Sequence, residues 1–171
     1  MTTVPRPSSS LVAFWALVGI GVLYVGDSLV RGDAHVFLLA LAPVGLIVWA
    51  AWLFLYRPRV SFDRDRVVIV NPGRIITVPW QRVSAVRQRF QILLHLDDGT
   101  TVTCWGSPFP EKPGRRRGEA TVQIVAPLEA ARAQVVGRAS EAPTERRWDL
   151  VPLGIGALLI VLCIAELVAA A

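Results

Sequence analysis

The sequence is poor in the residues that form disulfide frameworks, metal sites and catalytic dyads. Its 171 residues include only two cysteines and two histidines. Cys104 falls in a predicted strand and Cys163 in a long apolar stretch, so no disulfide is expected between them. His35 and His95 are far apart and share no metal-ligand spacing. No serine or cysteine stands in a nucleophile motif, so we expect neither a cofactor nor an enzymatic activity.

Charged residues are missing from three long stretches. Residues 36–56 contain none, and as a helix rising ~1.5 Å per residue they would reach about 31 Å, enough to cross a hydrocarbon core of roughly 30 Å. Similar stretches lie at Leu11–Gly26 and Leu150–Ala165. A signal peptide is the alternative for the first stretch, but no small-x-small cleavage site follows it. We therefore predict an N-terminal transmembrane hairpin in residues 1–56 and a third transmembrane helix, with spans at 11–30, 36–56 and 149–171.

Basic residues beside these stretches predict the orientation of the chain. The loop between the first two spans has two aspartates against one arginine, whereas pairs of arginines flank the later spans, at Arg57, Arg59, Arg146 and Arg147. The positive-inside rule then places the N-terminus and the segment 57–148 in the cytoplasm and the C-terminus outside a plasma membrane. The chain has a single lysine among its 18 basic residues, and this composition is typical of a GC-rich bacterial genome.

The segment after the second span changes to a strand-like pattern. Short β-branched runs separated by turn residues predict six or seven antiparallel strands, and Pro127 then opens a helix. Pro79 is expected to end a strand, Trp80 to be a core or rim aromatic, and Gly99 to supply the positive φ of an Asp-Asp-Gly hairpin. Strand alternation puts His95 and Cys104 on opposite faces, which argues against a dyad. The predicted parts are a cytoplasmic domain at 57–139 and a linker at 140–148.

Four sequence segments carry a resemblance to a known family. They read Arg59-Val60-Ser61-Phe62, then Val67-Val68-Ile69-Val70-Asn71-Pro72, then Thr77-Val78-Pro79-Trp80-Gln81-Arg82-Val83, and Leu94-His95-Leu96-Asp97-Asp98-Gly99-Thr100. Together they resemble the bacterial PH-like domain family of membrane proteins named after low molecular weight protein antigen 6. The resemblance covers about residues 57–105. It implies a spanning hairpin followed by a PH-like domain, and it carries over no catalytic residue and no ligand. The family's usual glycine in the first turn is absent, because residues 63–66 read Asp-Arg-Asp-Arg.

The expected fold is therefore a membrane-anchored α+β protein. Three transmembrane helices would carry an inserted PH-like antiparallel β-barrel or roll with a C-terminal helix. Two basic segments are candidate contacts for anionic lipid or a partner, one in the predicted loop 106–118 and one in the first hairpin: Lys112, Arg115, Arg116, Arg117, Arg64 and Arg66. A solvated loop is the alternative for the first segment, and Asp63 and Asp65 would oppose an anion at the second. Trp80, Pro79 and Gly99 are expected to be structural.

These features predict a non-catalytic binding module held at the membrane surface. Its expected partners are membrane lipids, through their anionic headgroups, or proteins of the cell envelope. Nucleic acid is not expected, because the basic loop contains a single aromatic residue, Phe109. The alternative is an accessory subunit of a transporter or envelope complex that acts mainly through its transmembrane helices. Glycines that let helices approach closely would mediate such contacts, or homo-oligomer formation, at Gly19, Gly21, Gly154 and Gly156.

Overall fold

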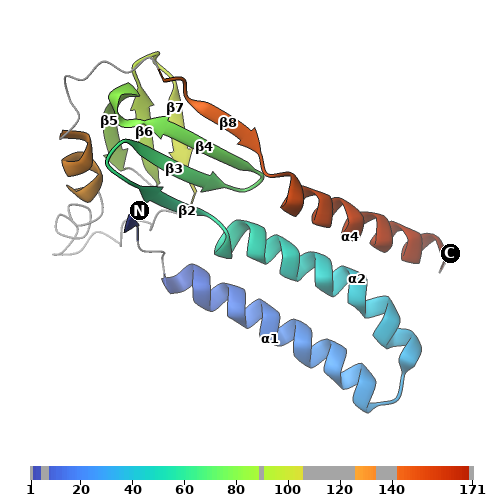
Figure 1. The fold of residues 1–171 in the computed structure, drawn as a ribbon. Coiled ribbons are helices and arrows are strands. Elements are labelled where there is room, and N and C mark those ends of the chain that lie inside the picture. Colours follow the sequence, from blue (N-terminus) through green and yellow to red (C-terminus); the bar gives the residue numbers. More distant parts are fainter. Residues whose placement is uncertain (1, 5–7, 89–90, 106–125, 134–141, 170–171) are drawn as a thin grey trace. The chain divides into compact units, whose positions relative to one another are not determined.

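The computed structural model describes residues 2–4, 8–88, 91–105, 126–133 and 142–169. The chain divides into two compact units (Figure 1). The helical unit comprises Ser8–Tyr56 and Asp149–Ala171, and the β unit comprises Met1–Pro7 and Arg57–Trp148. The β unit therefore includes residues from the N-terminus as well as the segment between the second and third apolar stretches.

The helical unit has three helices that are long and apolar enough to cross a membrane. Helix α1 spans Ser8–Val30, α2 spans Ala34–Ala51 and continues as the π-helical segment η1 over Trp52–Tyr56, and α4 spans Leu150–Ala169. Helix α2 packs against both α1 and α4. The three apolar stretches are thus confirmed as helices, and their ends lie within a few residues of the predicted ones.

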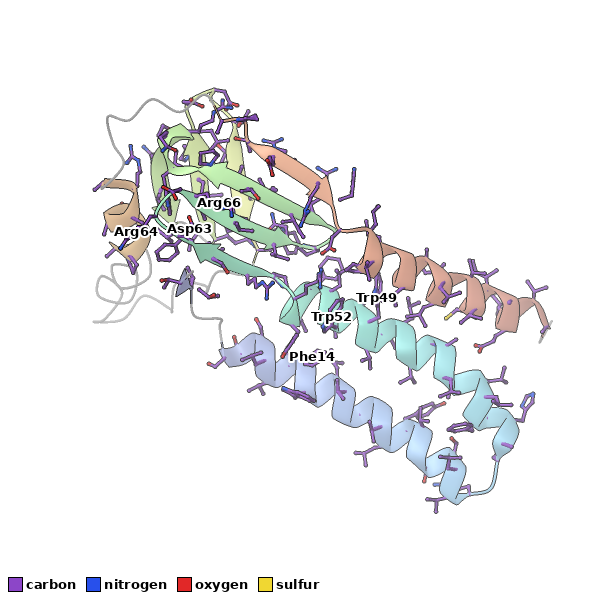
Figure 2. All side chains as sticks on the ribbon, in the orientation of Figure 1. Phe14, Trp49, Trp52, Asp63, Arg64 and Arg66 are labelled. Atoms are coloured by element: carbon purple, nitrogen blue, oxygen red, sulfur yellow. The ribbon has the colours of Figure 1, made fainter. Side chains whose placement is uncertain are left out.

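Two glycines let these helices approach closely. A Cβ atom on Gly21 would lie 2.9 Å from Val44, and one on Gly156 would overlap the ring of Trp49. The indole Nε1 of Trp49, labelled in Figure 2, donates a hydrogen bond to the carbonyl oxygen of Pro152 at 3.0 Å. Small residues at such positions bring helix backbones together, and the hydrogen bond links α2 to α4.

The β unit consists of two antiparallel sheets. Sheet A has the strand order β1-β2-β3-β4-β8, and sheet B has the order β5-β6-β7. A 3₁₀ turn, η2, at Trp80–Arg82 leads from sheet A to sheet B, and residues 126–133 are helical. The strands are β1 (Thr2–Thr3), β2 (Arg59–Phe62), β3 (Arg66–Asn71), β4 (Arg74–Pro79), β5 (Val83–Gln88), β6 (Ile92–Leu96), β7 (Thr101–Cys104) and β8 (Glu145–Trp148).

One hydrophobic core lies between the two sheets. Alternate residues of the strands point into it, as the period of two requires, and Val60, Val67 and Ile69 are fully buried from sheet A. The helix at 126–133 covers this core with Leu128, which is 0% exposed. Arg132 of the same helix donates from Nε to the carbonyl oxygen of Val83 at 2.8 Å. The helix is therefore attached to sheet B by both apolar and polar contacts.

Two strands at the edges of sheet A were not expected from the sequence. Strand β1 pairs Thr2 with Phe62 of β2, and strand β8 pairs Glu145 with Thr77 of β4. The predicted linker at 140–148 is thus wrong for its last four residues, which form β8. The predicted strand at 90–96 begins at Ile92 in the described part of the chain. The basic loop at 106–118 and the optional seventh strand at 121–125 lie outside the described residues.

Candidate functional site

The first hairpin, between β2 and β3, is organised by the side chain of Asp63. Its Oδ1 accepts hydrogen bonds from the backbone N–H groups of Asp65 and Arg66, both at 3.0 Å, and its own N–H donates to the carbonyl oxygen of Arg66. All described residues with positive φ are glycines, and none of them lies in this hairpin. An aspartate that bonds to the backbone ahead of it can shape a turn in this way. The hairpin therefore does not need the glycine of the PH-like family.

Trp80 fastens this hairpin to the core. The residue is 1% exposed, and its Nε1 donates to the carbonyl oxygen of Asp63 at 2.8 Å. Its backbone N–H also donates to the carbonyl oxygen of Asp65, and its ring meets Phe62 edge-on with 6.1 Å between centroids. Pro79 is the last residue of β4 and pairs with Arg66. Trp80 thus has the contacts of a structural residue, as its sequence context predicted.

The arginines of this hairpin lie among carboxylates. Figure 2 shows Asp63, Arg64 and Arg66 on it, and the Nε of Arg66 lies 3.6 Å from the Oδ2 of Asp63. Burial raises the pKa of Asp63, but the N–H groups of Asp65 and Arg66 and the charge of Arg66 outweigh it, so the pKa is below its usual value. Asp63 is therefore anionic at neutral pH and partly neutralises Arg66. Of the other predicted contacts, Lys112, Arg115, Arg116 and Arg117 lie outside the described residues.

Two shallow pockets flank the hairpin. The larger, about 370 Å³, holds Asp63 and Arg64 in its lining, and the smaller, about 240 Å³, holds Asp65 and Arg66. The remaining lining of the larger pocket comes from β1, β2 and the helix at 126–133, through Thr2, Phe62, Pro127, Ala130 and Ala131. The larger pocket thus combines one acid and one base, and the smaller combines Arg66 with two acids, Asp65 and Glu145. A lining with at least as many acids as bases suits a polypeptide segment better than a compact anion.

The hairpin between β6 and β7 has the Asp-Asp-Gly turn predicted from the sequence. Gly99 has a φ of +78°, which the turn requires. Hydrogen bonds from the hydroxyl and N–H of Thr100 hold the pKa of Asp98 below its usual value, and the charges of Arg82 and Arg146 act in the same direction. Arg82 is also paired with Asp97 at 2.9 Å. The acids of this turn are therefore matched by nearby arginines.

The polar residues of sheet B are occupied by contacts within the sheet. The hydroxyl of Ser84 donates to the carbonyl oxygens of His95 and Leu96, and His95 Nδ1 lies 3.0 Å from Thr101 Oγ1. Cys104 is 0% exposed, and burial raises the pKa of its thiol to about 12. A thiol with this pKa is almost wholly protonated at neutral pH and is a poor nucleophile. Within the described ranges, no group of three metal-ligating side chains could hold a metal ion.

The opposite end of sheet A gathers residues that are far apart in the sequence. Antiparallel pairing places Arg59 of β2 opposite Val70, Ile75 opposite Arg147 of β8, and Arg74 opposite Trp148. We call Arg59, Arg74, Arg147 and Trp148 the arginine end. The sequence indicated Arg59 and Arg147 only as topology signals, and Arg74 and Trp148 were missed. Only the strand register brings them together, and no local motif encodes it.

Comparisons of the chain with protein-family models, with curated proteins and with solved structures find no match. The class of protein is therefore defined by the structure alone. It is an α+β protein with antiparallel sheets and three helices that are able to span a membrane.

Proposed function

We propose that this is a multi-pass membrane protein that displays its β unit as a non-catalytic binding module at the cytoplasmic surface of a bacterial plasma membrane. One observation carries the proposal, namely that sheet A is built from segments that precede and follow the candidate spans. Strand β1 precedes α1, β2 follows η1, and β8 precedes α4. Such a sheet can form only if β1 and β2 lie on one side of the membrane, and the two crossings of an α1–α2 hairpin supply this.

The order of elements in the β unit supports a PH-like module. Strands β2 to β7, which surround one core, are followed by a helix that covers the core, and this is the order expected from the resemblance. Strand β8 comes after the helix and is an addition to that order. The cytoplasmic orientation follows from the arginines that flank the spans. A binding role is favoured over catalysis because Ser84, His95 and Cys104 are engaged or buried within sheet B.

The orientation is tested by labelling engineered cysteines in intact cells with a membrane-impermeant maleimide. In a Cys163→Ala background, His35→Cys in the α1–α2 hairpin should react in intact cells, and Arg64→Cys only after permeabilisation. Native Cys104 should stay unlabelled, since a rise in pKa from 9.0 to about 12 lowers its thiolate fraction about a thousandfold near neutral pH. Labelling of Arg64→Cys in intact cells would contradict the cytoplasmic orientation.

Binding at the hairpin is tested by a photo-crosslinking residue at Ala130, which lines the larger pocket. The balanced acid and base of that pocket should favour a polypeptide, so we expect one discrete protein adduct in native membranes. The matched control is the same residue at Glu129, which is exposed and does not line the pocket. Equal adduct patterns at the two positions would show that the pocket has no specific occupant.

An accessory subunit that acts through its helices is the alternative function. The structure leaves fewer of the predicted glycines to contact a partner, because Gly21 and Gly156 already pack against other helices within the helical unit. At Gly19 and Gly154 an added Cβ atom would meet no atom within 4 Å. A stoichiometric partner retained in mild detergent and lost on substitution of Gly19 would favour this alternative. A monomer under the same conditions would argue against it.

A further inference from the structure

The arginine end has a different charge pattern from the rest of sheet A. Its two outermost cross-strand rows are Arg59–Val70–Ile75–Arg147 and Asn71–Arg74–Trp148. These rows contain three exposed arginines and no acid. The acids of sheet A and its hairpin, Asp63, Asp65 and Glu145, all lie toward the opposite end of the strands. Sheet A is thus polarised along its strands, with the positive end at Arg59, Arg74 and Arg147.

The arginine end also carries an exposed aromatic side chain. Trp148 is 59% exposed, and the guanidinium carbon of Arg74 lies 4.1 Å from its ring centroid. Tryptophan and arginine both combine an apolar body with a polar tip, and both are favoured at the boundary between hydrocarbon and water. The pair therefore has the chemistry of the headgroup layer of a membrane. Asp149, the acid that follows Trp148 in the sequence, is buried, with only 8% of its surface exposed.

The length of the connecting chain limits how far this end can be from the candidate spans. Arg59 is three residues after Tyr56, and Trp148 is two residues before Leu150. At ~3.5 Å per residue these connections reach at most about 10 Å and about 7 Å. The headgroup region adds roughly 5–8 Å on each side of the hydrocarbon core. The hairpin arginines Arg64 and Arg66 have no such constraint, because they stand at the other end of β2 and β3.

The spacing of the arginines argues against a site for one small anion. Arg59 on β2 and Arg147 on β8 are separated by three inter-strand spacings, which amounts to about 14 Å. Their row and the row of Arg74 point to opposite faces of the sheet, because successive residues of a strand alternate. One phosphate cannot contact all three guanidinium groups at that separation. A planar layer of many phosphates, met by the end of the sheet, can contact all of them.

We propose that the arginine end is the surface by which the β unit contacts the anionic phospholipid headgroups of the leaflet at which its spans emerge. This proposal rests on the proposed function, since it assumes that the helices cross the membrane. It names the ligand class, anionic phospholipid, and the contact residues Arg59, Arg74, Arg147 and Trp148. Contact at this end would hold the sheet upright on the leaflet and leave the first hairpin and its pockets free for a second partner.

The proposal is tested on the full chain in nanodiscs by hydrogen–deuterium exchange. Peptides that cover β2 and β8 should exchange at least about fivefold more slowly in phosphatidylglycerol than in phosphatidylcholine, because headgroup contacts oppose local opening of the sheet end. The difference should disappear in 0.5 M salt, at which the Debye length is only a few ångströms. It should also disappear in the triple variant Arg59→Gln, Arg74→Gln, Arg147→Gln.

The matched control removes charge from the other end of the same sheet. The double variant Arg64→Gln, Arg66→Gln should keep the full difference in exchange between the two lipids. If it loses as much of that difference as the triple variant does, net charge explains the effect and the proposal is overturned. Exchange of the core peptide around Leu94 should be unchanged in every variant, which shows that the β unit is folded.

Two further outcomes would also overturn the proposal. Equal exchange of β2 and β8 in the two lipids would show that headgroups do not contact this end. Slow exchange restored by soluble glycerol phosphate in phosphatidylcholine nanodiscs would indicate a site for a single anion instead of a lipid layer. Neither result would affect the outcome of the cysteine-labelling test of orientation, so failure of this proposal is distinguishable from failure of the proposed function.

Discussion

Replacing Trp80 with alanine should lower the free energy of unfolding of the β unit by about 3–5 kcal/mol, the usual cost of truncating a large buried aromatic residue. Trp80 is 1% exposed, so the truncation leaves a cavity where its ring meets Phe62. It also removes the indole N–H that donates to the carbonyl oxygen of Asp63. A domain of this size is stable by only about 5–15 kcal/mol, so the variant should lose about a fifth or more of its stability.

The loss is measured by pulse proteolysis of the full chain in micelles across a urea series. Trp105→Ala is the matched control, because Trp105 is 50% exposed, and it should cost less than about 1 kcal/mol. Trp80→Phe reduces the first contribution and removes the second, since it keeps most of the ring volume but not the donor to Asp63. It should cost about 1–2 kcal/mol. A Trp80→Ala midpoint close to that of the Trp105→Ala control would show that Trp80 does not hold the hairpin to the core.

The long apolar helices and the central strands could be predicted from the sequence because their signals are local. The absence of charge from residues 36–56 indicates a long apolar helix without reference to the rest of the chain. In β6, the alternation of Ile92, Leu94 and Leu96 with Leu93 and His95 gives the strand and its buried face together. Each of these signals lies within one element, so tertiary contacts were not needed to detect it.

The edge strands of sheet A could not be predicted in the same way. Strand β8 reads Glu-Arg-Arg-Trp, is exposed at every position and has no apolar alternation. Strand β1 is two residues long. Both form because the adjacent strands β4 and β2 offer unpaired backbone groups, and a short charged sequence is typical of a protected sheet edge. Their pairing depends on residues about 60 to 70 positions away, which no local pattern encodes.

Strand register also explains why the contact residues predicted from the sequence differ from those of the arginine end. Arg64 and Arg66 stand out in the sequence because they are close together, but the turn that makes them adjacent also places Asp63 beside Arg66. Arg74 and Trp148 are separated by most of the β unit and become neighbours only through the pairing of β4 with β8. A charge pattern in the sequence therefore indicates how much charge is present, and the strand register determines which charges act together.

Replacing Gly156 with alanine should disrupt the packing of α2 against α4. The new Cβ atom would overlap the Trp49 ring, and that ring cannot turn away without breaking its 3.0 Å hydrogen bond to Pro152. Overpacking of this kind costs about 1–3 kcal/mol. Disulfide formation between Gly45→Cys and Leu159→Cys reports on the packing, since a Cβ atom at Gly45 would lie 3.5 Å from Leu159. With Cys163 replaced by alanine, the rate of crosslinking should fall at least about fivefold.

Gly154→Ala is the matched control for this substitution. It makes the same change two residues earlier in α4, at a position where the added Cβ atom meets no atom within 4 Å. Its crosslinking rate should equal that of the parent, because the added methyl group meets no neighbouring atom. Alanine also has a higher helix propensity than glycine, so the substitution should not weaken the helix. Combining Gly156→Ala with Trp49→Leu should restore most of the rate, since the smaller side chain removes the overlap. If both alanine variants slow the reaction equally, helix propensity or lipid contacts govern it and the Trp49–Gly156 contact does not.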